Sequence, residues 1–107
     1  MAFYELRQYC VRPGKMAAWL KIMEEEIIPF QVAQGMVITG SYKGESDEAV
    51  YVWMRRFESE ATREALYKAV YDSDHWKKEI APRIPDLLDR EKMVVTRIVP
   101  TSRSVAQ

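Results

Sequence analysis

The chain has 107 residues, of which 48% are hydrophobic and 30% charged, a composition typical of one ordinary globular domain spanning residues 1–107. Its 16 basic and 16 acidic residues cancel, which argues against nucleic acid or an anionic membrane as a partner. Cys10 is the only cysteine, so an intramolecular disulfide and a thiolate metal cluster are excluded, and without a signal-peptide pattern we expect a cytoplasmic protein.

The first predicted element is a strand over residues 3–11, whose side chains alternate between two faces. One face mixes charges with aromatic rings and carries Phe3, Glu5, Arg7, Tyr9 and Val11. The opposite face carries Tyr4, Leu6, Gln8 and Cys10. We expect this second face to pack under the helices and the mixed face to stay uncovered.

A helix is predicted to start at Lys15, because apolar residues from Met16 to Ile27 recur at spacings of three and four. Pro29 should end or kink this helix, since proline lacks a backbone donor and crowds the preceding turn. Gly35 is a suitable C-cap for a last turn after the proline.

Two further strands, residues 36–42 and 49–57, flank the polar loop 43–48 and predict a hairpin. Gly40 indicates a bulge or a close backbone approach in the first of them. In the second, Val50, Val52 and Met54 share one face. The other face again mixes rings with a charge: Tyr51, Trp53, Arg55 and Phe57.

Ser59 is a plausible N-cap for a second long helix, followed by a short helix that carries His75 and Trp76. The last strand covers residues 91–99, and we expect residues 101–107 to form a frayed tail. Leu20 and Val52 are predicted to be core residues where the helices meet the sheet.

This order of elements, β-α-β-β-α-β, predicts a ferredoxin-like α+β fold. In that fold a four-stranded antiparallel sheet has the spatial order 4-1-3-2 and both helices on one face. An uncovered aromatic face of this size normally marks an interface or a ligand site. We therefore expect a homodimer in which two sheets pack face to face.

At this point the sequence resembles the NIPSNAP family, within the dimeric α+β barrel superfamily. The resemblance is carried by Tyr4-Glu5-Leu6-Arg7 with Tyr9, Pro13-Gly14-Lys15, Trp19-Leu20, Pro29, Tyr51-Val52-Trp53 and the segment SDHWKKEIAP at 73–82. It implies the same fold and a dimeric α+β barrel. Superfamily relatives include cofactor-free monooxygenases, haem-degrading enzymes and dehalogenating or cyclising enzymes, with sites between the helices and the open face of the sheet.

The candidate site residues come from the mixed strand faces and from the only histidine. We expect His75 and Arg7 as catalytic candidates. His75 would act as a general base or, by resemblance to the superfamily, as a haem ligand, and an exposed surface position is the alternative. The ligand-binding candidates are Glu5, Arg7, Tyr9, Tyr51, Trp53 and Arg55. A purely structural ion pair between Glu5 and Arg7 is the alternative to an arginine that binds a carboxylate or phenolate. We expect no cofactor and no metal.

Three functions remain open from the sequence. The protein is a cofactor-free enzyme for a small anionic or aromatic molecule, a binding module for such a molecule, or a structural homodimer. No Ser/His/Asp arrangement, phosphate-binding glycine loop or paired-carboxylate motif favours the first.

Overall fold

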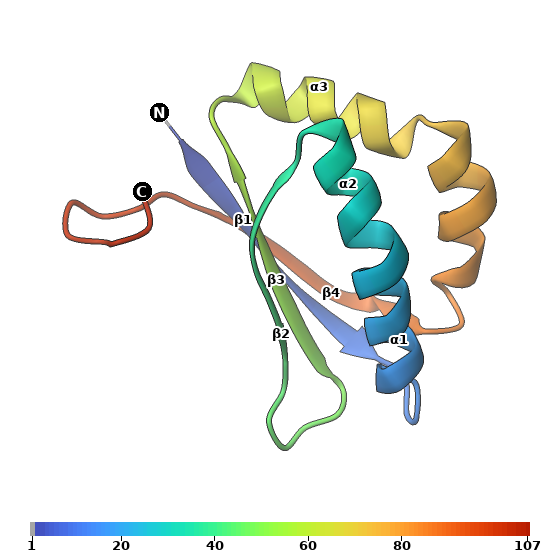
Figure 1. Ribbon diagram of the computed structural model, residues 1–107. Helices are drawn as coiled ribbons and strands as arrows, with labels where there is room; N and C mark the ends of the chain where they lie inside the picture. Colours follow the sequence, from blue (N-terminus) through green and yellow to red (C-terminus); the bar gives the residue numbers. More distant parts are fainter. Residues whose placement is uncertain (1) are drawn as a thin grey trace.

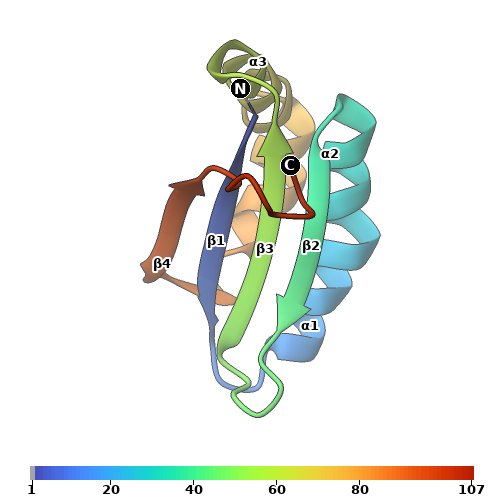
Figure 2. The same ribbon diagram turned by 90° about the vertical axis from the view of Figure 1, so that its left-hand side faces the viewer.

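The structure, a computed structural model, describes residues 2–107 and places all the helices on one face of an antiparallel sheet (Figure 1). The four strands are β1 (Phe3–Val11), β2 (Val37–Lys43), β3 (Val50–Phe57) and β4 (Leu88–Ile98). Their spatial order is β2-β3-β1-β4, so the predicted ferredoxin-like arrangement is confirmed (Figure 2).

The central strands β1 and β3 pair without a register shift over residues 3–10 and 50–57, with Leu6 opposite Met54 and Tyr9 opposite Tyr51. A shift of register between Ile38 and Gly40 of β2 confirms the predicted bulge. Because the register is continuous on β1 and β3, their alternate side chains form two well-defined faces of the sheet.

The first helical segment is one continuous rod made of α1 (Met16–Ile22), the π-helical turn η1 (Met23–Ile27) and α2 (Ile28–Gln34). Pro29 has no N–H to donate to the preceding turn, and the widened turn η1 ends two residues before it. Gly35 ends the rod in a left-handed conformation with φ of 109°, as predicted for a C-cap.

The second helical segment, on the same face of the sheet, starts with α3 (Glu60–Tyr71). Ser59 is its N-cap as predicted, with its Oγ accepting the Thr62 N–H at 3.1 Å. A second π-helical segment, η2 (His75–Ile80), and the short 3₁₀ turn η3 (Ala81–Arg83) lead to β4. No helix among residues 2–107 is both long and apolar enough to cross a membrane.

Our assignment of the two faces of the sheet is wrong. The mixed face lies under the helices: Phe3, Tyr9, Tyr51, Trp53 and Phe57 are all buried there. Val52, which we expected in the core, is on the uncovered outer face with Cys10, whereas Leu20 does pack against the core. The reason is that the charged members of the mixed face, Glu5 and Arg55, find their partners on the helices.

Residues 101–107 turn back over the outer face, where we had expected a frayed tail (Figure 2). The Tyr4 hydroxyl and the Arg56 Nε–H both donate to the main-chain oxygen of Gln107, at 3.1 and 2.7 Å. Tyr4 is therefore only 4% exposed although it belongs to the face without helices.

Candidate functional site

A cavity of about 140 Å³ lies between the inner face of the sheet and the helices. Both helical segments and three of the four strands, β1, β3 and β4, contribute to its wall. Aromatic rings form much of this wall, including Tyr9, Trp19, Trp53, Tyr71 and Trp76. All three tryptophans of the chain thus line one cavity.

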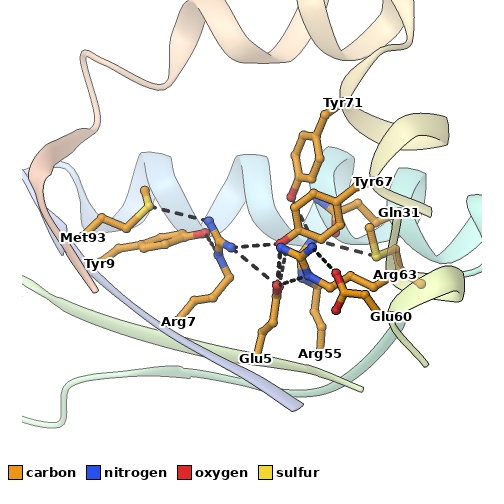
Figure 3. A network of polar contacts seen from close by, with 11 residues as sticks. Glu5, Arg7, Tyr9, Gln31, Arg55, Glu60, Arg63, Tyr67, Tyr71 and Met93 are labelled. Carbon is orange, nitrogen blue, oxygen red and sulfur yellow. Dashed lines mark hydrogen bonds and ion pairs between the residues drawn. The ribbon is translucent and has the colours of Figure 1, made fainter. Parts of the chain in front are cut away.

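Arg7, on the central strand β1, is a charged residue that lines this cavity. Figure 3 shows its polar contacts. Its Nε–H donates to the Tyr9 hydroxyl at 2.7 Å, and Nη1 donates to the Tyr67 hydroxyl at 3.2 Å. The contact of Nη2 is with the Met93 thioether sulfur, at 3.6 Å. A thioether is a weak acceptor, so this side of the guanidinium is poorly satisfied.

Glu5 is the carboxylate around which the neighbouring network is built (Figure 3). It accepts from Arg55 Nη2 and from Arg63 Nε, each at 2.8 Å, and from the Tyr67 hydroxyl at 2.6 Å. Arg7 Nη1 is 3.6 Å from the same carboxylate, which is the longest of its three ion-pair distances. Charges on β1, β3 and α3 are thereby joined at one carboxylate.

The charges of this network do not cancel. Three arginines share the Glu5 carboxylate, and the second carboxylate, Glu60, contacts Arg63 at its exposed edge at 3.3 Å. Arg55 is completely buried and is held further by Gln31 and Tyr71. Arg7 is therefore the cation with the least compensation, and it borders the cavity.

The pKa shifts show which groups keep their charge or proton at neutral pH. Burial pushes the pKa of Glu5 up, but the Tyr67 and Arg63 hydrogen bonds and the Arg55 charge hold it below its usual value, so the carboxylate stays ionised. Burial raises the pKa of Tyr9, against the Arg7 charge, and raises that of Tyr67 to about 12. Both hydroxyls therefore stay protonated.

The polar groups of the cavity wall are mainly donors. The indole N–H groups of Trp19 and Trp53 are buried without a hydrogen-bond acceptor among residues 2–107. The Tyr9 oxygen already accepts from Arg7, which leaves its own proton available. No carboxylate, imidazole, thiol or amine side chain from residues 2–107 lines the cavity. Such a wall favours a ligand that only accepts hydrogen bonds, an anion above all.

The structure brings part of the expected site together. Arg7, Tyr9 and Trp53 line the cavity, whereas Glu5 and Arg55 form the ionic network beside it. Tyr51 packs behind the cavity against Tyr9 and Trp19, with ring centroids 6.1 and 5.8 Å away. Its hydroxyl lies 2.5 Å from Ser41 Oγ, and burial raises its pKa to about 12.

His75, our candidate general base, lies elsewhere. It is exposed and packs its ring against Phe30, with the centroids 4.7 Å apart, and it does not line the cavity. Within residues 2–107 no group of three or more His, Cys, Asp or Glu side chains is placed to hold a metal ion.

Sequence reasoning missed the helical half of the site. Arg63, Tyr67 and Tyr71 follow each other at intervals of four on α3, which puts them on one helix face and could have identified them as partners of the sheet. Trp19 and Trp76 lie on apolar helix stripes, where packing alone explains them. Nothing in the sequence distinguishes Met93 from a core methionine.

Comparisons with known proteins agree on the fold. The NIPSNAP family model matches residues 4–103. A NIPSNAP family protein from Agrobacterium tumefaciens superposes with a TM-score of 0.88 at 24% identity, over 100% of both chains. A second from that organism, of unknown function, gives 0.88 at 24% over 99% of this chain and 94% of that one. An uncharacterised NIPSNAP domain protein from Burkholderia xenovorans gives 0.82 at 21% over 95% and 97%. No curated protein matches. At 21–24% identity, these structural similarities support the fold alone.

Proposed function

This chain belongs to the NIPSNAP family, and from that premise we propose that it binds a compact carboxylate in the cavity beside Arg7. The observation that carries the proposal is the partly buried Arg7 at the cavity wall, whose Nη2 meets only a thioether sulfur. A donor left without a good acceptor costs about 1–3 kcal/mol, and an anionic ligand on Arg7 Nη2 would recover that cost.

The size of the cavity limits the ligand. Its volume of about 140 Å³ is close to that of an engineered apolar cavity of roughly 150 Å³ that binds benzene. One aromatic ring, or an aliphatic chain of similar bulk, therefore fits beside the carboxylate. Trp19, Trp53 and Trp76 supply flat apolar contacts for such a body.

Binding is better supported than acid–base catalysis. A general base works best when its pKa lies near the working pH, and the titratable cavity residues are arginines and tyrosines. A second candidate, cofactor-free catalysis on the same ligand, is favoured by one observation. N–H and O–H donors such as those of Arg7 and Tyr9 are also what stabilises an oxyanion that develops during a reaction.

The proposal includes a homodimer formed through the outer face of the sheet. Apolar side chains remain exposed on that face, among them Val37, Tyr42 and Val94, which are 49%, 57% and 56% exposed. A second copy would cover them. Sedimentation at micromolar concentration tests this part, and a stable monomer would contradict it.

The binding test uses the tryptophans as the probe, because all three line the cavity. Benzoate is titrated into the protein and tryptophan fluorescence is recorded, with neutral benzamide as the matched ligand. We expect saturable quenching by benzoate and much weaker binding of benzamide, since only benzoate carries a negative charge to compensate Arg7.

Two variants separate the site from the rest of the sheet. Arg7→Gln should weaken benzoate binding roughly ten- to a hundredfold, the loss of one charge-assisted pair. Arg56→Gln removes the same type of side chain from the outer face of β3 and should leave binding unchanged. Equal binding by wild type and Arg7→Gln, or no binding of small carboxylates by the wild type, would refute the proposal.

A further inference from the structure

The side chain that meets the free side of Arg7 is a methionine. Arg7 Nη2 lies 3.6 Å from Met93 Sδ, whereas its other nitrogens donate to hydroxyl oxygens (Figure 3). Met93 belongs to β4 and lines the cavity together with the exposed Arg90. The thioether thus contacts the donor that a ligand carboxylate would use, and it binds that donor only weakly.

We propose that Met93 is an oxidation-controlled latch on the anion site, an inference that rests on the proposed function. A peroxide transfers one oxygen atom to the Met93 sulfur. The thioether is oxidised by two electrons to the sulfoxide, and hydrogen peroxide is reduced to water. The new sulfoxide oxygen is a strong acceptor, directed at the same Arg7 donor that now contacts sulfur.

The latch works by competition within one molecule. A tethered acceptor has an effective concentration in the millimolar range or above, so it outcompetes a dilute free carboxylate for Arg7. Oxidation therefore closes the site without unfolding the protein. Reduction of the sulfoxide restores the weak thioether and reopens it.

Exposure makes Met93 accessible to the oxidant. Met93 is only partly buried and lies on an edge strand, whereas Met23 and Met36 are 0% and 2% exposed. Met54 is also partly buried, but it lies on the outer face of the sheet, opposite the cavity. It provides an internal control for oxidation that does not touch Arg7.

The experiment combines peroxide treatment with benzoate titration of the full chain. Oxidation at each methionine is mapped by peptide mass spectrometry. We expect benzoate binding to weaken at least tenfold in step with Met93 sulfoxide and to recover after treatment with methionine sulfoxide reductases. Met93→Leu should bind benzoate equally before and after peroxide, while Met54→Leu should lose binding as the wild type does.

Met93→Gln extends the test, because its amide oxygen places a strong acceptor near Arg7 without any oxidation. It should bind benzoate at least tenfold more weakly than Met93→Leu. Peroxide inactivation of Met93→Leu, or full binding by Met93→Gln, would overturn the latch. If untreated wild type binds no benzoate, the proposed function fails instead. The latch is then judged by the ¹⁵N resonance of the Arg7 side chain, which must shift on oxidation of Met93 if the inference holds.

Discussion

Replacing Glu5 by glutamine tests the ionic network most directly. Glu5 is 1% exposed and accepts from Arg55, Arg63 and Tyr67 at 2.6–2.8 Å. Glutamine keeps one acceptor oxygen but turns an NH₂ group toward arginine donors. It also leaves the completely buried Arg55 without a counter-charge. Breaking a buried ion pair on one side costs about 3–5 kcal/mol.

This cost converts into a measurable shift of the melting temperature. An unfolding entropy of about 2.1 cal/mol/K per residue gives about 0.22 kcal/mol/K for 107 residues. A loss of about 3–5 kcal/mol therefore lowers the melting temperature by roughly 13–22 °C. Circular dichroism during heating, with urea unfolding for the free energy, measures both quantities.

Glu26→Gln is the matched control. Glu26 also pairs with an arginine, Arg83, at 2.6 Å, but both side chains are 39% or more exposed. Exposed pairs contribute about 0–1 kcal/mol, so this variant should melt within a few degrees of the wild type. If Glu5→Gln and Glu26→Gln unfold at the same urea concentration, the reasoning about the buried network is refuted.

The remaining predictions concern pH, a hydroxyl and a cap. The folded-state pKa of Glu5 is lowered, so the ionised carboxylate contributes to stability above about pH 4.3. This contribution is lost as the pH falls through the folded-state pKa. Acid unfolding of Glu5→Gln should therefore be less steep than that of the wild type. Tyr67→Phe removes a donor to Glu5 and an acceptor from Arg55, and urea unfolding should show a loss of about 1–3 kcal/mol. Ser59→Ala leaves the Thr62 N–H without its acceptor and should lower the free energy of unfolding by about 1 kcal/mol in the same assay. An unchanged free energy would show that the cap does not stabilise α3.

The fold was predictable because its signals are local. Strand alternation, the left-handed Gly35, the cap at Ser59 and the bulge near Gly40 each depend on a few neighbouring residues. The π-helical turns η1 and η2 were not predictable, since the same apolar stripe fits an α-helix. Local patterns thus define the elements but not the details of their hydrogen bonding.

The orientation of the sheet depended on contacts that are distant in sequence. Charged strand residues normally face water, which favours the uncovered face of the sheet for Glu5 and Arg55. In the structure their partners lie on the helices: Gln31 on α2, and Arg63 and Tyr67 on α3. These partners offset the cost of burial. The same error moved Tyr51 and Trp53 to the wrong side of the sheet, although it kept the right residues together. Arg7, Tyr9 and Trp53 therefore line one cavity as predicted, but the cavity lies under the helices and not on the uncovered face.

The pairing of the first strand with the last affects how the protein is made. β1 lies between β3 and β4, with Tyr4 opposite Ile98 at one end and Val11 opposite Leu88 at the other. On the ribosome β1 emerges first but has one unpaired edge until β4 leaves the exit tunnel, and such long-range pairing is slow to form. An open strand edge readily pairs with other chains. A nascent chain stalled before residue 88 would therefore expose one edge of its central strand.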